Sequence, residues 1–120
     1  MSYDIAFKVK VEGRDLYVEV GDCTANITWN LRDMIVQSTG LEWKNEENNG
    51  LCKDVIPHIE KGWRELVYHP QKYKKYEAPN GWGTVDGCVR FFRNILDAWH
   101  DFCESYDTRK LVDVTYFWIE

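Results

Sequence analysis

Three stretches of the sequence place tryptophan beside amide and hydroxyl side chains. An indole offers a flat apolar face for stacking, while neutral amides and hydroxyls can hydrogen-bond the polar edge of a stacked ring. The pattern therefore predicts a site for a small polar ring system or for the loop of a partner protein. The candidate ligand-binding residues are Asn26, Thr28, Trp29 and Asn30 in the first stretch, Trp43 in the second, and Asn80, Trp82 and Thr84 in the third.

A second interpretation of the same residues needs no ligand. Asn and Gly are common in turns because they tolerate backbone conformations that most residues avoid. Each tryptophan would then fold back as a lid over the core. The residue types alone leave both interpretations open.

The position of Trp82 raises the question most sharply, because this residue lies between Gly81 and Gly83, just before a predicted long helix. The glycines supply no side chain to pack beside the indole, and they allow unusual backbone conformations. We therefore interpret Trp82 as a platform that contacts something outside its own core, with Asn26 and Asn30 as its nearest polar neighbours. The alternative is a cover over the long helix.

Other residues that could do chemistry form no recognisable catalytic or metal site. Asp97, His100 and Cys103 recur at helical spacing, but Cys103 belongs to an apolar stripe and structural zinc normally takes four ligands. A nucleophilic Cys23 would need a nearby base, which the sequence does not identify. The glycines at residues 81–83 lack the lysine of a phosphate-binding loop. We expect no metal, no cofactor and no enzymatic activity.

Alternating apolar residues predict the strands that must position these loops. The alternation over residues 3–12 and 16–20, separated by a short turn, indicates a β-hairpin with one buried face. The closing residues 110–120 are rich in β-branched and aromatic side chains, which predicts a third strand that pairs with the hairpin. The expected sheet is antiparallel and three-stranded.

Apolar residues at helical spacing predict three helices between the hairpin and the last strand. The clearest pattern runs over residues 84–106, with Thr84 as the expected N-cap and Trp99 in the centre of the apolar stripe. The predicted order is β-β-α-α-α-β, and the predicted class is α+β with the helices packed on one face of the sheet. We expect residues 1–120 to form a single domain.

Composition and charge restrict the partners. The 120 residues are 44% hydrophobic, which is enough for one core, and the formal net charge is −5. An acidic chain is a poor general binder of nucleic acid, although it could dock on a basic protein. The sequence leaves open whether copies of the chain associate as a homo-oligomer. The alternating, charged N-terminus is unlike a signal peptide, and no apolar run has membrane-spanning length, so we expect a cytoplasmic protein with free thiols and no membrane partner.

Five segments resemble a family of small proteins from phages and prophages of Gram-positive bacteria. They are "YDIAFKVKVEG", "GDCTANITWN", "GLEWKNEENNGLCKDVIP", "YEAPNGWGTVDGCVRFF" and "TYFWIE". The resemblance spans most of the chain but transfers no catalytic residue. What it implies is a setting inside the infected host cell, because small accessory phage proteins without enzyme motifs often counter host defence.

Two functional hypotheses follow. In the first, the protein binds and sequesters a small nucleotide-like ligand through the loops that carry Asn and Trp. In the second, it inhibits a host defence enzyme by direct contact through an acidic, aromatic-rich surface.

Overall fold

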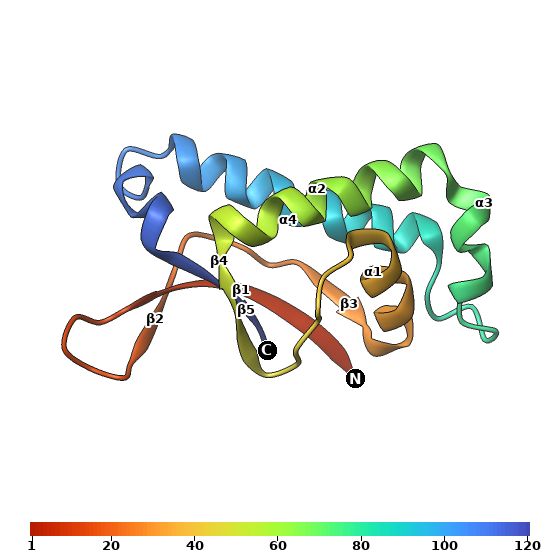
Figure 1. Cartoon of the computed structure of the whole chain (residues 1–120), viewed down its shortest axis with the longest axis horizontal. Coiled ribbons are helices and arrows are strands. Elements are labelled where there is room, and N and C mark those ends of the chain that lie inside the picture. The colour runs from red at the N-terminus through yellow and green to blue at the C-terminus, as the bar shows by residue number, and fades with distance from the viewer.

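An antiparallel five-stranded sheet forms one layer of the protein, and helices form the other (Figure 1). The computed structural model describes all 120 residues. The strand order is β2-β1-β5-β4, and β3 pairs with the N-terminal part of β1. The strands are β1 (Ser2–Lys10), β2 (Tyr17–Val20), β3 (Asn26–Thr28), β4 (Glu47–Leu51) and β5 (Thr115–Ile119).

The predicted α+β class is confirmed, but the sheet has five strands and not three. β1 and β2 form the predicted hairpin, and β5 is the predicted last strand. The prediction of strand over residues 110–114 is wrong, because these residues belong to a short 3-10 helix and β5 begins only at Thr115; β5 lies between β1 and β4. The two additional strands are short and lack that alternation. β4 has the sequence Glu-Asn-Asn-Gly-Leu, which reads as a polar loop, and β3 spans only three residues. The predicted order β-β-α-α-α-β is therefore incomplete.

The helical layer contains two long helices and several short ones. The long helix predicted over residues 84–106 is α4, and its expected cap is confirmed because Thr84 Oγ1 accepts a hydrogen bond from the Gly87 N–H at 3.0 Å. The helical elements are η1 (Trp29–Leu31), α1 (Arg32–Thr39), α2 (Cys52–Tyr68), α3 (Pro70–Tyr73), η2 (Lys74–Tyr76), α4 (Val85–Glu104) and η3 (Arg109–Val114).

The core lies between the sheet and the α2–α4 pair. Phe7 and Phe117 from the sheet meet Phe92 and Ile95 from α4, and all four are fully buried. Trp99, expected at the centre of this core, is only half-buried and lies at its margin. Its ring stacks on Phe102 at a centroid distance of 5.1 Å, so it closes the end of the helix–sheet interface.

The opposite face of the sheet carries no helix (Figure 1). The residues of β1 that point away from Phe7 pair across the strands with Tyr17, Tyr116 and Trp118. These three rings form a half-buried cluster, and the Lys8 ammonium lies 4.6 Å from the centroid of Trp118.

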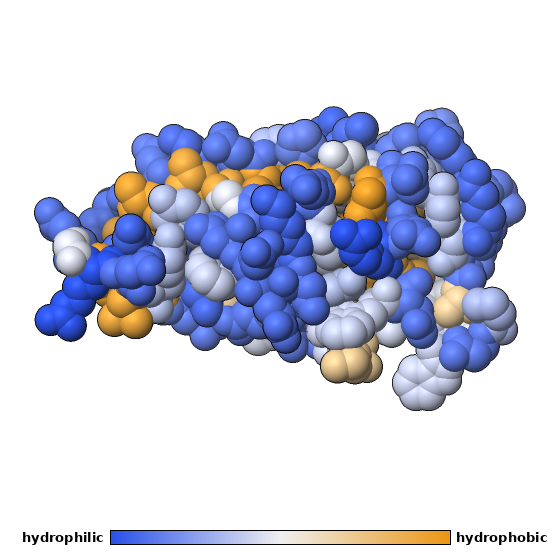
Figure 2. Space-filling view, turned by 60° about the horizontal axis from the view of Figure 1, so that its bottom comes forward, coloured by the Kyte–Doolittle hydropathy of each residue, from blue (hydrophilic) through white to orange (hydrophobic).

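The surface is mostly hydrophilic, with apolar areas at the end of the molecule that carries the β1–β2 hairpin and in a narrow band that runs from there past the middle (Figure 2). Leu16, Val18 and Val114 are the exposed aliphatic residues near this end, at 52%, 48% and 53% exposure. None of the helices is both long enough and apolar enough to cross a bilayer.

Candidate functional site

Two of the three tryptophan-containing loops meet at one end of the sheet. β3 pairs with the first residues of β1, so the chain from Asn26 to Asn30 lies at the sheet end where α4 begins. The Asn30 side-chain amide donates a hydrogen bond to the Trp82 carbonyl at 3.4 Å. The two loops and the first turns of α4 enclose a groove of about 440 Å³, called here the Trp82 groove.

The loop that carries Trp82 is closed by its own hydrogen bonds. The Ala78 N–H donates to the Gly83 carbonyl at 3.1 Å, and the Asn80 side chain accepts from the Trp82 N–H at 3.0 Å. Gly83 has φ +149°, and a Cβ at this position would lie 2.9 Å from the Leu31 side chain. These restraints fix the backbone while the indole remains free.

Trp82 is 72% exposed. The prediction that its side chain points away from the core is confirmed, and the alternative of a cover over α4 is wrong. Because its neighbours Gly81 and Gly83 offer no side chain, nothing local draws the ring inward. A large aromatic held outward on a closed loop is suited to stacking against another molecule.

The groove contains one charged side chain, Arg90, and no carboxylate. Arg90 forms no ion pair within the chain, and it lies near Asn94 one turn further along α4. The Asn94 side chain makes no hydrogen bond inside the protein, so its amide is available for a ligand. A single unpaired guanidinium on a neutral wall favours an anionic group, which it can bind through paired N–H donors.

Asn26 and Thr28 contribute hydrogen-bonding oxygens at the sheet side of the groove. The Asn26 side-chain amide donates to Ser2 Oγ at 3.0 Å and to Asp4 Oδ1 at 2.5 Å, which leaves its Oδ1 as a free acceptor. Thr28 Oγ1 accepts from the Asn30 N–H at 3.4 Å and retains its hydroxyl donor. The neutral wall can therefore both donate and accept.

The start of α4 is less available to a ligand, because two of its first backbone N–H groups already have side-chain partners. Thr84 caps the Gly87 N–H, and Glu77 Oε2 accepts from the Val85 N–H at 2.8 Å. Thr84 therefore lines the groove mainly as a helix cap.

The predicted residues divide between two hollows. Asn26, Thr28, Trp82 and Thr84 line the Trp82 groove. Asn30 and Asn80 instead line a separate hollow of about 460 Å³ on the other side of the loop, together with charged residues such as Lys75 and Glu77. Asn30 still supports the groove through its bond to the Trp82 carbonyl.

The remaining two predicted tryptophans lie outside both hollows. Trp29 is half-buried, stacks on Tyr3 at 5.9 Å, and donates its indole N–H to the Ser2 carbonyl at 2.8 Å. Trp43 is only 2% exposed and packs against the rings of Tyr3, Phe91 and Phe117. The expectation that Trp43 offers a binding surface is corrected, because its indole is part of the core.

The sequence prediction omitted Arg90 and Asn94. Arg90 follows Gly87 by three residues and Asn94 follows Arg90 by four, which places all three positions on one face of a helix. The loop before this helix was already part of the predicted site. The helix face that follows it, with Arg90 and Asn94, could therefore have been included from the sequence.

The thiols do not add a reactive group to the site. Burial raises the pKa of Cys23 to about 11 and also raises the pKa of Cys52 and Cys88, so these side chains stay protonated at neutral pH. No group of three or more His, Cys, Asp or Glu side chains is arranged to hold a metal ion.

No known family model, curated protein or solved structure matches this chain. The functional argument therefore starts from the geometry of the groove.

Proposed function

We propose that the protein binds and sequesters a small anionic, nucleotide-like molecule in the Trp82 groove, without chemical turnover. The base stacks on the exposed face of Trp82, and a phosphate pairs with Arg90. Asn94, Thr28 and the free oxygen of Asn26 hydrogen-bond the edge of the base or the sugar. The observation that carries the proposal is the outward indole on a closed loop beside an unpaired arginine.

The composition of the groove supports binding over catalysis. Its lining includes no Cys, His, Asp, Glu or Lys, the residues that most often act as general acid, general base or nucleophile. Thr28 and Thr84 bring hydroxyls, but no base among the lining residues could activate them. A ligand held here would be retained without being converted.

The biological setting of the proposal comes from the sequence resemblance to small phage and prophage proteins. In that setting, retention of a nucleotide without turnover lowers the free concentration of a host defence signal. The protein would then act as a counter-defence protein in the cytoplasm of the infected cell.

Calorimetric titration with nucleoside monophosphates, nucleoside diphosphates and cyclic dinucleotides tests the proposal. Base–aromatic stacking contributes about 1–3 kcal/mol per base, so Trp82→Ala should weaken binding by about 5- to 150-fold. Arg90→Gln should weaken binding of phosphorylated probes and leave the corresponding nucleosides unaffected. Tyr68→Ala is the matched control, because Tyr68 is 71% exposed on α2 and lies outside the groove.

If no probe binds, or if Tyr68→Ala and Trp82→Ala weaken binding equally, the groove is not the site. Tryptophan fluorescence gives a second readout, because a base stacked on Trp82 quenches a signal that is absent from Trp82→Ala.

The alternative function is direct inhibition of a host enzyme, and the C-terminal end of α4 favours it. This end exposes Asp101 and Glu104, and Tyr106 beyond it is 80% exposed. The His100 ring lies between these two carboxylates, and the Arg109 guanidinium lies 5.0 Å from the Tyr106 centroid, so a basic partner would compete with these side chains for the same groups. The two functions separate in one assay, since inhibition through this end would survive Trp82→Ala but fall in Tyr106→Ala.

A further inference from the structure

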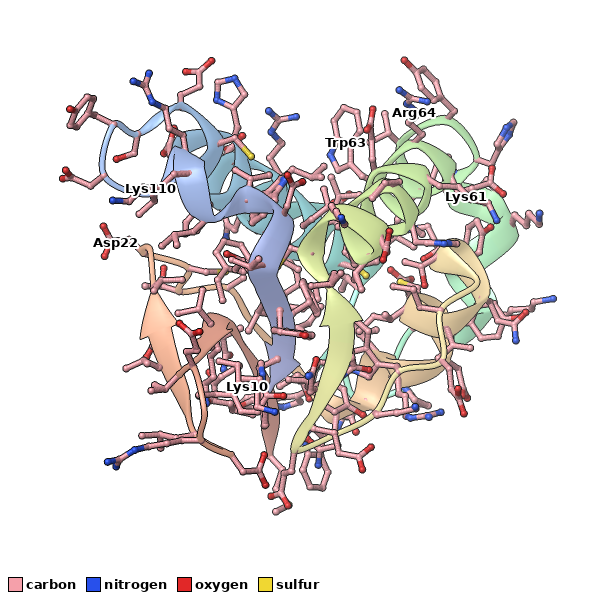
Figure 3. The ribbon with its side chains drawn as sticks, turned by 60° about the vertical axis from the view of Figure 1, so that its left-hand side comes forward. Lys10, Asp22, Lys61, Trp63, Arg64 and Lys110 are labelled. Carbon is pink, nitrogen blue, oxygen red and sulfur yellow. The ribbon has the colours of Figure 1, made fainter.

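The strand β2 is one edge of the sheet. It is the outermost strand next to β1, and Figure 3 shows it at the margin of the sheet. Natural edge strands usually carry lysine, proline or a bulge that prevents pairing with another chain. β2 has the sequence Tyr-Val-Glu-Val, so its protection is limited to its short length and the charge of Glu19, and it carries neither lysine nor proline.

The inner side of this edge is apolar and uncovered. Val18 pairs with Val9, and the Val11 N–H donates to the Leu16 carbonyl at 2.7 Å, so these four aliphatic residues share one face. Val18 is 48% exposed and Leu16 is 52% exposed. Figure 1 shows that the tip of the hairpin extends beyond the two long helices. Val114 at the end of η3 reaches Val9 and Val11, whereas Leu16 and Val18 remain exposed.

We propose that a second copy of this chain covers it, with the two β2 strands paired antiparallel about a two-fold axis at Val18. In an antiparallel pair, alternate residues direct their backbone N–H and C=O to opposite edges. Leu16 bonds to β1, so Leu16 and Val18 face β1 while Tyr17 and Glu19 direct their backbone groups to the free edge. These are the groups that a second β2 would pair with.

The side chains of β2 are self-complementary in this register. Val18 meets Val18 of the second copy, and Leu16 meets Val20 of the second copy, so the apolar face continues across the axis. Glu19 lies opposite Tyr17 of the second copy. An axis at Glu19 would place the two copies of Glu19 opposite each other. An axis at Tyr17 would place Glu19 opposite Asp15 of the second copy. Both registers are disfavoured, because like charges directly opposite are destabilising.

Charges beyond the strand favour the same register. Asp22 follows β2 and is exposed, and Figure 3 shows it at the margin of the molecule. The axis at Val18 brings Asp22 opposite Arg14 in the hairpin turn of the second copy, and the reciprocal pair forms on the other side. Neither residue has an ion-pair partner within its own chain, so both are available.

This association leaves the proposed ligand site open. The Trp82 groove lies at the start of α4, whereas β2 packs near its C-terminal end, where a Cβ on Gly21 would meet the Phe102 ring. A twofold assembly through β2 therefore has two accessible grooves. If the chain proves to be a monomer, the ligand-binding proposal is unaffected.

Sedimentation equilibrium of the full chain tests the assembly. The wild type should show twice the chain mass of 14.3 kDa. Val18→Lys places two ammonium groups at the axis and should reduce the mass to that of one chain, with an unchanged circular dichroism spectrum. Val67→Lys is the matched control, because Val67 is 40% exposed on α2, away from β2, and this variant should keep the doubled mass.

Cysteine cross-linking tests the register. Directly opposed residues of an antiparallel pair have Cβ atoms about 4.5–5.5 Å apart. Val18→Cys should therefore form a cross-linked species of doubled mass under mild oxidation with diamide, while Glu19→Cys, which faces Tyr17, should not. A single-chain mass for the wild type at every concentration would overturn the proposal, as would a doubled mass that persists in Val18→Lys. Cross-linking through Glu19→Cys and not Val18→Cys would overturn the register.

Discussion

The loops that carry Trp43 and Trp82 are similar in composition and opposite in outcome. Both place a tryptophan near asparagines, and in both an asparagine side chain closes the turn: Asn49 bonds the Lys44 N–H and carbonyl, and Asn80 bonds the Trp82 N–H. Yet Trp43 is 2% exposed and Trp82 is 72% exposed.

The difference comes from what surrounds each indole. Trp43 has three aromatic neighbours, Tyr3, Phe91 and Phe117, whose ring centroids lie 5.7–6.1 Å away. Trp82 has glycine on both sides and no ring against it. In these two loops, the burial of the tryptophan therefore depends on the apolar side chains that contact it from other elements. The composition of the loop itself says little about those contacts.

The largest expected effect is that of Trp43→Ala. Removing a fully buried aromatic side chain costs about 3–5 kcal/mol in the free energy of unfolding, because it leaves a cavity as well as losing apolar burial. Urea denaturation measures it. A loss under about 1 kcal/mol would mean that the indole does not hold the core, and the contrast with Trp82 would collapse.

Trp43→Phe tests whether packing alone holds the ring at this position. The Trp43 indole N–H is buried without a hydrogen-bond partner, so packing alone holds the ring. A smaller ring removes this unpaired donor and keeps much of the apolar volume. We expect a loss well below that of Trp43→Ala in the same urea titration.

Gly83→Ala should have the next largest effect, because it attacks the loop that aims Trp82. At φ +149° an alanine is strained, and its Cβ would lie 2.9 Å from the Leu31 side chain. Backbone strain of this kind costs about 1–3 kcal/mol. Thermal unfolding checks the stability. Gly13→Ala, at φ +76° with open space around it, is the control for the backbone term without the contact with Leu31.

Thr84→Ala should cost less, about 1 kcal/mol, because it removes one N-cap hydrogen bond from α4. Thr84→Ser keeps the accepting hydroxyl and should restore most of the loss. If serine and alanine unfold at the same urea concentration, the cap contributes nothing and the start of α4 is fixed by the Glu77 contact instead.

The sequence predicts the fold best where one face of an element is buried. β1 and α4 alternate or repeat their apolar residues at the period of their structure, so Phe7 and Phe92 indicate the core directly. β4 is held by backbone pairing to β5 and by the Asn49 side chain, and its pairing shifts register between Asn48 and Leu51. None of these features leaves an apolar pattern in the sequence. Its residues therefore resemble a loop.

One part of the candidate site could be predicted from the sequence: two of the loops precede helices, and such loops can lie together at one end of the sheet. Asn26 and Thr28 meet Trp82 for that reason, and the expectation that the first and third stretches are neighbours holds in the structure. Arg90 was missed because a single arginine on an exposed helix face resembles any solvated residue. Only the position of the loop beside it makes its side chain part of a groove.

Trp82→Ala should have the smallest effect on stability. It also tests the contrast between Trp43 and Trp82 most directly. An exposed side chain without tertiary partners usually changes the free energy of unfolding by no more than about 0.5 kcal/mol. The loop keeps its shape without the indole, since the Ala78–Gly83 and Asn80 hydrogen bonds involve the backbone of residues 78–83 and the Asn80 side chain. Urea midpoints of Trp82→Ala and Trp43→Ala, measured side by side, should therefore differ by most of the Trp43 loss. If Trp82→Ala instead unfolds as readily as Trp43→Ala, the ring packs inward in solution, and the groove loses the surface on which a base could stack.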